Sequence, residues 1–470
     1  MKLSPVRLLP YREPMAKPQP YRADPAILAL GDGYFDPVAA ADFPECRLRF
    51  ANRRWAARVG LELDDDGWAR HFGRFEPLAD NLPTPLALRY HGHQFRSYNP
   101  DIGDGRGFLF AQLRDDHGRL LDLGTKGSGQ TPYSRFGDGR LTLKGGMREV
   151  LATEMLEALG VNTSKSFALI ETGEHLTRND EPSPTRSAVL TRLSHGHVRI
   201  GSFQRLAYHE DPAGIAALVR YSLENLFGEE EGDDDGANAI RMFVLAAEAT
   251  ATLAASYLAA GFVHGVLNSD NINITGESFD YGPWRFAPTW DEAFVAAYFD
   301  HQGLYAFGRQ PEAIQWDLAQ LGGCLALVAD GPGLADILGD WSRQFEAALV
   351  AALVRRLGIE PDATRDRALV SALLAILRKQ AVKIDRFFFD WRGGRVPDGG
   401  DERLAGLLGG RTPLPHALDH DYWRDNGPCL MPIDEVEAIW AAIAEADDWG
   451  PFEAKIAAIR RMGAAQGVTP

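Results

Sequence analysis

The stretch HGVLNSDNINITGESFDYG, residues 264–282, brings a histidine, an Asp-Asn pair and a later aspartate into an otherwise apolar region. Within it, NINIT alternates like a short strand, GES predicts a turn and FDYG predicts a returning strand. Such a hairpin would bring Asn271 and Asp280 together at its open end. Amide and carboxylate oxygens suit Mg²⁺ that is shared with phosphate groups. The stretch therefore predicts a metal site facing a phosphorylated ligand.

The order of these polar residues is close to that of a protein-kinase catalytic loop. A kinase carries His-Arg-Asp, an Asn five residues after that Asp, and then Asp-Phe-Gly. Here Asn271 follows His264 by seven residues and Asp280 opens Asp-Tyr-Gly, but Val266 stands where the catalytic Asp belongs. Asp270 is a carboxylate of the loop that has no predicted role as a metal ligand, which makes it the candidate general base. The alternative is that Asp270 only caps the turn before the strand.

A glycine-rich turn and a lysine precede this loop in the chain. In DIGDGRGFLFAQLRDDHGRLLDLGTKG, Gly103, Gly105 and Gly107 alternate before the strand FLFAQL, and the strand LLDLGTK ends at Lys126. Glycines let backbone N–H groups approach phosphate oxygens closely. Taken alone, the glycines read as an ordinary hairpin. With Lys126, their order is that of a kinase nucleotide site, and not that of a Rossmann or Walker loop.

The helix predicted over GGMREVLATEMLEALG, residues 145–160, supplies glutamates near the lysine. Glu149, close to the start of this helix, could hold Lys126 by an ion pair that directs its ammonium group toward phosphates. We interpret Glu154 and Glu157 as solvated surface acids, as most helical glutamates are.

Two arginines complete the predicted phosphate site. Arg192 and Arg199 lie seven residues apart in AVLTRLSHGHVRIGSF, near strand-like segments. Guanidinium groups bind phosphate in a bidentate manner. By themselves, these two arginines would be interpreted as surface residues.

Composition limits the class of protein. The chain has 470 residues, 45% hydrophobic content and a net charge of −16, which argues against general affinity for nucleic acid or an anionic membrane. We expect no membrane span, because no apolar run approaches the ~20 residues required, and no signal peptide in the Pro-rich start. Three distant cysteines predict neither a disulfide framework nor a zinc cluster. The expected location is the cytoplasm.

Patterning divides the chain into a strand-rich and a helix-rich part. The first ninety residues are Pro-rich and irregular, with one helical patch around FANRRWAARVGL. Short strands and one helix follow to about residue 203. A solvated acidic loop over 228–236 leads into a helix that Gly261 ends, and the chain after Phe286 is mostly helical. This order predicts an α+β, two-lobed enzyme.

Together, YHGHQF, GDGRG, LGTKGSGQTPYSRFGDGR, REVL, TRLSHGHVRIGSF, HGVLNSDNINITGESFDYGPW and YAFGRQP form a highly specific set. The chain from about residue 45 to beyond 320 resembles the selenoprotein O family of pseudokinases, also called the YdiU family. The resemblance implies a protein-kinase-like fold with a strand-rich N-lobe and a helical C-lobe. It also implies an adenylyltransferase that transfers AMP from ATP to Ser, Thr or Tyr hydroxyls of proteins and releases pyrophosphate. ATP would be bound in the reverse sense to a kinase.

Carried over residue by residue, the resemblance implies a role for each predicted site residue. Asp270 would be the proton acceptor, and Asn271 and Asp280 would be the ligands of Mg²⁺, with Mn²⁺ as the alternative. Lys126 and Glu149 would form the ion pair that supports the phosphates, and Arg192 and Arg199 would enclose the terminal phosphate. The other nucleotide-binding residues would be Gly103, Gly105, Arg106, Asp138 and Gly139. The expected domains are an N-terminal extension (1–89), an N-lobe (90–203) and a C-lobe (204–470). Some members of the family end in selenocysteine or cysteine, whereas this tail, RMGAAQGVTP, has neither.

The same residues are compatible with two other functions. A conventional kinase or small-molecule phosphotransferase would use the Lys, Glu, Asn and Asp equally well, although Val266 argues against it. A non-catalytic nucleotide-binding scaffold is the second alternative, and a metal pair combined with a base argues against that.

Overall fold

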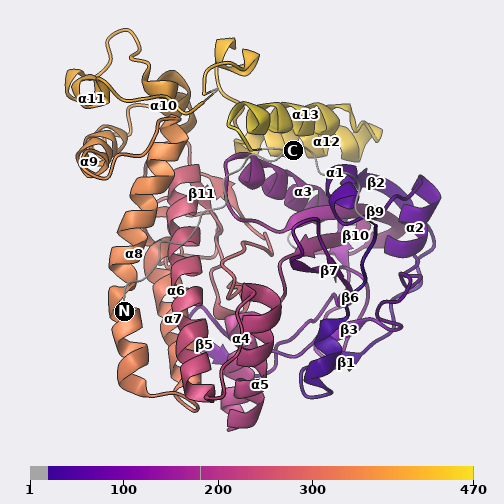
Figure 1. The fold of residues 1–470 in the computed structure, drawn as a ribbon. Helices are drawn as coiled ribbons and strands as arrows, with labels where there is room; N and C mark the ends of the chain where they lie inside the picture. Colours follow the sequence, from indigo (N-terminus) through magenta and orange to yellow (C-terminus); the bar gives the residue numbers. More distant parts are fainter. Residues whose placement is uncertain (1–19, 180, 416, 469–470) are drawn as a thin grey trace.

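The computed structural model describes residues 20–179, 181–415 and 417–468, and within them the chain is a mixed α/β protein (Figure 1). Its main sheet is antiparallel, with the order β1-β3-β6-β7-β10-β9-β2 and β8 paired to β10. The strands are β1 Phe35–Pro37, β2 Arg47–Ala51, β3 Leu86–Leu88, β4 Gly92–Gln94, β5 Ser97–Asn99, β6 Leu109–Arg114, β7 Leu120–Lys126, β8 Leu141–Thr142, β9 Lys165–Leu176, β10 Thr185–Ser194, β11 Phe262–Val263 and β12 Arg285–Phe286.

Helices cover the sheet and continue beyond it. They are α1 Arg53–Arg58, α2 Asp65–Phe72, α3 Leu143–Ala158, α4 Ile200–Tyr208, α5 Pro212–Ser222, α6 Asp235–Ala260, α7 Gln310–Leu325, α8 Gly331–Leu357, α9 Asp366–Leu377, α10 Ile384–Asp390, α11 Glu402–Leu408, α12 Ile433–Ala446 and α13 Gly450–Ala465. In Figure 1, α6, α7 and α8 stand together on one side of the molecule and the sheet on the other, while α13 packs against α3.

The strands predicted around the lysine are confirmed. Every residue of β7 is buried, because β7 lies inside the sheet between β6 and β10. Its register pairs Lys126 with Leu190 and Gly124 with Arg192. Since alternate residues of a strand share one face, Lys126 and Arg192 are diagonal neighbours on the same face of the sheet.

The segment before residue 90 is more ordered than its composition predicts. The helical patch is confirmed as α1, but β1, β2 and β3 are strands of the main sheet that we did not predict. Each has only three to five residues, and RLRFA in β2 carries charges at alternate positions. Strands this short acquire their stability from partners far away in the chain, so local patterning identifies them poorly.

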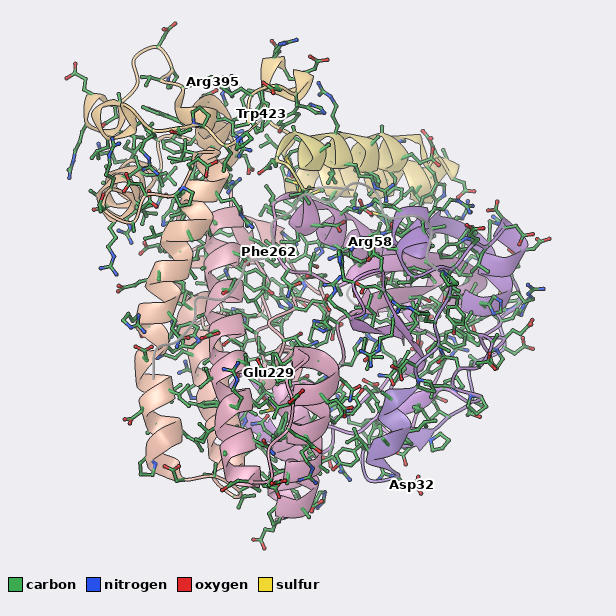
Figure 2. The ribbon with its side chains drawn as sticks, in the orientation of Figure 1. Asp32, Arg58, Glu229, Phe262, Arg395 and Trp423 are labelled. Atoms are coloured by element: carbon green, nitrogen blue, oxygen red, sulfur yellow. The ribbon has the colours of Figure 1, made fainter. Side chains whose placement is uncertain are left out.

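Helix α6 forms much of the core beside the sheet. Its residues Phe243, Ala247, Ala251, Ala254 and Leu258 are buried. As predicted, Gly261 ends the helix, in the left-handed conformation (φ 69°). Phe262, which follows it, is fully buried and is labelled in the interior in Figure 2. By length and composition, α6 could cross a membrane, which corrects our expectation that no run is long enough. However, 72% of its apolar window is buried inside the protein, as in the core helices of folded domains.

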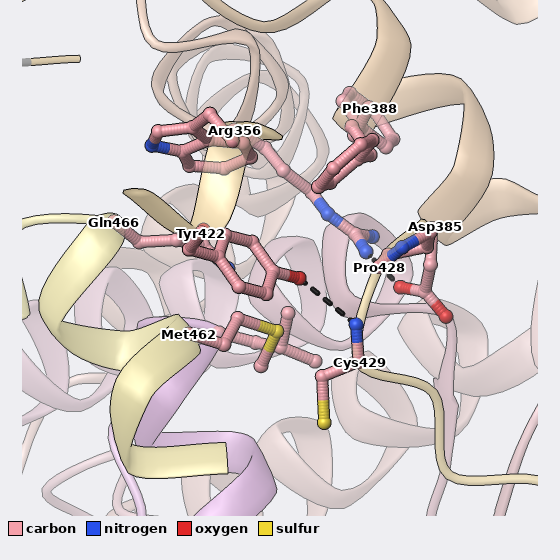
Figure 3. A pocket seen from close by; sticks show the side chains of 11 residues that line it. Arg356, Asp385, Phe388, Tyr422, Pro428, Cys429, Met462 and Gln466 are labelled. Atoms are coloured by element: carbon pink, nitrogen blue, oxygen red, sulfur yellow. Dashed lines mark hydrogen bonds and ion pairs between the residues drawn. The ribbon is translucent and has the colours of Figure 1, made fainter. Parts of the chain in front are cut away.

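The C-terminal segments are tightly packed against α8 and α10. Figure 3 shows the small cavity at this junction, whose volume of about 20 Å³ is enough for about one water molecule. Arg356 is ion-paired with Asp385 there, and the backbone N–H of Cys429 donates to Tyr422 Oη at 2.9 Å. The first contact joins α8 to α10, and Arg386 of α10 connects the segment before α12 to the helical core by donating to the Asn426 oxygen at 2.6 Å.

The interpretation of Glu154 and Glu157 as solvated acids is wrong, because both are buried between α3 and its neighbours. Glu154 accepts two hydrogen bonds from Arg460 of α13, at 2.7 and 2.8 Å. Glu157 accepts from Trp55 Nε1 at 2.9 Å and pairs with Arg54. Burial alone would raise the pKa of Glu157, but the positive charges of Lys165 and Arg54 outweigh burial and lower it.

Glu154→Ala should therefore lower the free energy of unfolding by about 1–3 kcal/mol. The change leaves Arg460 without its partner, and the cost is below that of a fully buried pair because the Arg460 side chain is 37% exposed. Urea titration of the parent and the variant measures the difference. Glu453→Ala, at an exposed position of α13, is the matched control and should change stability little. Equal stability of Glu154→Ala and the parent would mean that this pair does not hold α13 on α3.

Candidate active site

A cleft of about 700 Å³ opens between the glycine-rich segment, the ends of β7 and β10, and the loop that contains Asp270. This volume is typical of small-molecule sites. The predicted site residues that line it are Gly103, Gly105, Arg106, Lys126, Asp138, Gly139, Arg192, Arg199, Asp270 and Asp280. Glu149 and Asn271 are not part of the lining, but Glu149 is ion-paired with the lining residue Lys126, and Asn271 follows the lining residue Asp270 in the chain.

Lys126 is held between two carboxylates at the buried end of the cleft. Its ammonium group is ion-paired with Glu149, as predicted, and lies 2.5 Å from Asp280 Oδ1. Arg192 Nη1 lies 3.3 Å from the same oxygen. Burial would raise the pKa of Asp280, but the charges of Lys126 and Arg192 overcome it and hold this pKa well below its usual range. Asp280 is therefore an anion at any physiological pH.

Arg199 is also buried, which excludes the interpretation of the two arginines as surface residues. It precedes the first residue of α4, and its guanidinium group donates to the backbone oxygen of Asp270 at 3.1 Å. The same group lies over the Tyr90 ring, 4.2 Å from its centroid, and 3.6 Å from Asp104 Oδ1. Arg199 thus supports the loop that carries Asp270 and adds positive charge to the cleft.

The glycines before β6 are required by close packing. They do not form a simple hairpin turn, because β5 and β6 belong to different sheets. A Cβ at Gly103 would lie 2.5 Å from the Tyr133 ring, and one at Gly107 would lie 2.0 Å from the backbone oxygen of Thr125. The glycine-rich segment therefore fits between β7 and the 127–140 loop, both of which line the cleft.

The hairpin predicted over 271–282 is wrong. Ser269–Asn271 forms a single 3₁₀ turn, and the chain after it pairs with the segment before α4. Ile274 N–H donates to the Val198 oxygen at 3.1 Å, and Ile200 N–H donates to the Ile272 oxygen at 3.0 Å. The alternation of NINIT correctly indicates buried isoleucines, but their strand partner is distant in sequence. His264 instead joins the two ends of the loop, since its Nε2 lies 2.9 Å from the Phe279 oxygen.

Asp270 has the environment of a proton acceptor. It is 8% exposed, and its Oδ1 has no hydrogen-bond partner among the described residues. Burial raises the pKa of Asp270 to about 7, although the charge of Arg199 opposes this shift. The missing side chain of Gly92 leaves room beside it, because a Cβ there would lie 2.9 Å from Oδ1. A carboxylate with a pKa near neutrality is suited to general base catalysis.

Asn271 and Asp280 offer oxygen ligands for a divalent ion. Asn271 Nδ2 donates to the Val266 oxygen at 3.0 Å, so the amide nitrogen is committed and the amide oxygen is left as its ligand atom. Within residues 20–179, 181–415 and 417–468, no group of three or more His, Cys, Asp or Glu side chains could hold a metal alone. The donor set fits Mg²⁺ whose remaining ligands are phosphate oxygens and water.

The outer part of the cleft is formed by residues that we did not predict. Tyr133, Ser134, Arg135 and Phe136 line it beside Asp138, which is ion-paired with Arg178 at 2.8 Å. These residues belong to the motif KGSGQTPYSRFGDGR, so their positions between Lys126 and Asp138 could have indicated them. Gly139, at the base of this loop, adopts φ 71° and packs directly on Gly129.

Comparison with known proteins finds one family that matches most of the chain. The family model described as Protein adenylyltransferase SelO matches residues 20–403. Protein nucleotidyltransferase YdiU of Synechocystis sp. is 43% identical over 464 residues, covering 91% of this chain and 96% of the relative. The YdiU proteins of Synechococcus elongatus (41% identical, 95% and 96% covered) and Rhodopseudomonas palustris (35% identical, 91% of each covered) are also similar. The chain belongs to the SelO family of protein adenylyltransferases.

Proposed function

We propose that this enzyme transfers AMP from ATP to Ser, Thr or Tyr hydroxyls of proteins in the cytoplasm and releases pyrophosphate. The observation that carries the proposal is the burial of three cationic side chains at one end of the cleft. Lys126, Arg192 and Arg199 are buried at its inner end, whereas Arg135, Phe136 and Asp138 in its outer part are exposed. A buried cationic group suits the terminal phosphates of ATP, and this leaves the α-phosphate to face the acceptor hydroxyl.

We further propose that the fold is protein-kinase-like and two-lobed. The N-lobe would comprise residues 90–203 and the C-lobe residues 204–470, with 1–89 as an N-terminal extension that adds β1, β2 and β3 to the main sheet. The support is the order of parts: a glycine-rich segment, a strand ending at Lys126, a helix with Glu149 paired to it, and a later loop with Asn271 and Asp280. The first nineteen residues of the extension lie outside the described part of the chain.

In the proposed reaction, Asp270 accepts the proton of the substrate hydroxyl as its oxygen attacks the α-phosphorus. A bond forms between this oxygen and the α-phosphorus, and the bond from the α-phosphorus to the pyrophosphate oxygen breaks. Lys126, Arg192 and Arg199 stabilise the negative charge that builds up on the leaving pyrophosphate. Positioning and charge neutralisation of this kind supply most of the catalysis in phosphoryl transfer.

Mg²⁺, or Mn²⁺ in its place, would be held by Asn271 and Asp280, and when bound it would neutralise charge on the phosphates. Without nucleotide, the anionic Asp280 is paired with Lys126 and Arg192. Binding of the triphosphate would offer these two cations phosphate oxygens instead. Asp280 would then be available as a ligand.

ATP labelled at the α- or the γ-phosphate tests the transfer. We expect α-label to appear on protein, including the enzyme itself, and γ-label to remain in solution as pyrophosphate. Mass spectrometry of the modified peptide gives the added group and the accepting residue. Transfer of label to protein from the γ-phosphate alone would favour a conventional kinase over an adenylyltransferase. Binding of ATP with transfer of neither label to any protein would favour the nucleotide-binding scaffold.

A further inference from the structure

Phe136 is the most exposed large apolar side chain among the described residues, with a relative exposure of 107%. It lines the outer part of the cleft, in the 127–140 loop between Lys126 and Arg140. A single exposed apolar residue is ordinary on a protein surface. An exposed phenylalanine in the wall of a ligand cleft is different, because its ring offers an apolar face to a ligand that enters the cleft.

The loop that presents Phe136 is held in place on several sides. Ser134 Oγ donates to the Gly105 oxygen at 2.6 Å, and Gln130 Nε2 donates to the Gly137 oxygen at 2.8 Å. The N–H of Gly129 donates to the Gly139 oxygen at 3.2 Å, which closes the base of the loop. Arg135 adopts a left-handed backbone (φ 52°), which a residue other than glycine rarely does. Such a conformation immediately before Phe136 is typical of functional sites.

The other apolar side chains of the cleft lining are already engaged. Tyr90 is buried beneath the Arg199 guanidinium group, and Tyr133 packs against Gly103 and donates its hydroxyl to Asp36. Ile102 is buried and faces the space beside Gly92. Among the described lining residues, Phe136 is thus the apolar group with a free face. Phe136 is also fully exposed, whereas the cations Lys126, Arg192 and Arg199 of the same cleft are buried.

We propose that Phe136 is the stacking platform for the base of the bound nucleotide, an inference that rests on the proposed placement of the triphosphate at Lys126. A triphosphate whose terminal group is held at the buried end extends its nucleoside toward the cleft mouth, where Phe136 stands. Stacking of a base on an aromatic ring strengthens binding by about tenfold and tolerates any base, since every base has a π-face. The site therefore takes the aromatic base of a nucleoside triphosphate.

Calorimetric titration of ATP and of inorganic triphosphate, both with Mg²⁺, tests the inference, because inorganic triphosphate has no base. Phe136→Ala should weaken ATP binding about tenfold and leave the affinity for inorganic triphosphate unchanged. Phe136→Tyr, which keeps the ring, should bind ATP like the parent. Leu327→Ala, another exposed apolar position outside the cleft, is the matched control and should change neither affinity. Since Phe136 is fully exposed, its replacement should not disturb folding.

Two results would contradict the proposal that Phe136 stacks on the base. One is an unchanged affinity of Phe136→Ala for ATP. The other is an equal loss for ATP and inorganic triphosphate, which would assign the effect to the loop and not to the base. Failure of the proposed function would be seen in a different experiment: the parent enzyme would transfer no α-label to protein. The binding measurement requires no transfer, so the two outcomes are distinguishable.

Discussion

Replacement of Arg192 and Arg199 by alanine in one variant should weaken ATP binding by about a hundredfold or more. Each arginine would make a charge-assisted contact to the terminal phosphate, and contacts of this kind contribute about 1.5–3 kcal/mol each. ADP lacks that phosphate, so the variant should also lose most of its preference for ATP over ADP. Calorimetric titration of both nucleotides into the parent and the variant measures the two effects. AMP transfer should fall with ATP binding.

Because both arginines are buried, thermal unfolding must first establish that the double variant is folded. Arg343→Ala serves as the matched control, since Arg343 is an exposed arginine of α8 whose partner is Asp340. It should bind both nucleotides like the parent. An ATP/ADP ratio that stays at the parent value in the double variant would mean that the arginines do not hold the terminal phosphate. The proposal that ATP is bound in the reverse sense to a kinase would then lose its main support.

Asp270→Asn should lower the turnover of AMP transfer by about 10²–10⁴-fold while ATP binding changes little. The amide has nearly the shape of the carboxyl group but cannot accept the proton, and general base catalysis contributes a factor of this size. A base acts mainly in the transition state, so its loss affects kcat more than nucleotide affinity. Initial rates of α-label transfer and calorimetric titration of ATP separate the two quantities.

The matched control for Asp270→Asn is Asp101→Asn, at an exposed carboxylate outside the cleft lining, which should transfer AMP at the parent rate. If Asp270→Asn also transferred AMP at the parent rate, the assignment of the base would be wrong. A joint loss of ATP binding and transfer would instead assign Asp270 a role in holding the nucleotide.

Much of the inner cleft follows from local sequence patterns. The apolar run before Lys126 predicts β7, and the apolar stripe around Glu149 predicts α3; the ion pair between these residues is present. Both elements are long enough for their periodicity to be read; Lys126 is the last residue of β7, and Glu149 lies near the middle of α3. Placement of Lys126 beside Glu149 then needs only that the helix pack on the strand.

Features that depend on distant partners could not be predicted in this way. NINIT has the alternation of a strand, but alternation identifies only the buried face and does not identify the partner, which is the segment around Val198. Glu154 looks like a surface residue of α3 because its partner, Arg460, is 306 residues away. The short strands before residue 90 are missed for the same reason. Long-range pairing, and not local propensity, decides each of these cases.

The position of the γ-phosphate in a crystal structure with Mg²⁺ and a non-hydrolysable ATP analogue tests the reversed nucleotide most directly. We expect the γ-phosphate to lie at the buried end of the cleft, in contact with Lys126, Arg192 and Arg199. The α-phosphate should then be the phosphate nearest Asp270. A γ-phosphate next to Asp270, with the base at the buried end, would mean that ATP is not bound in the reverse sense and would support a kinase.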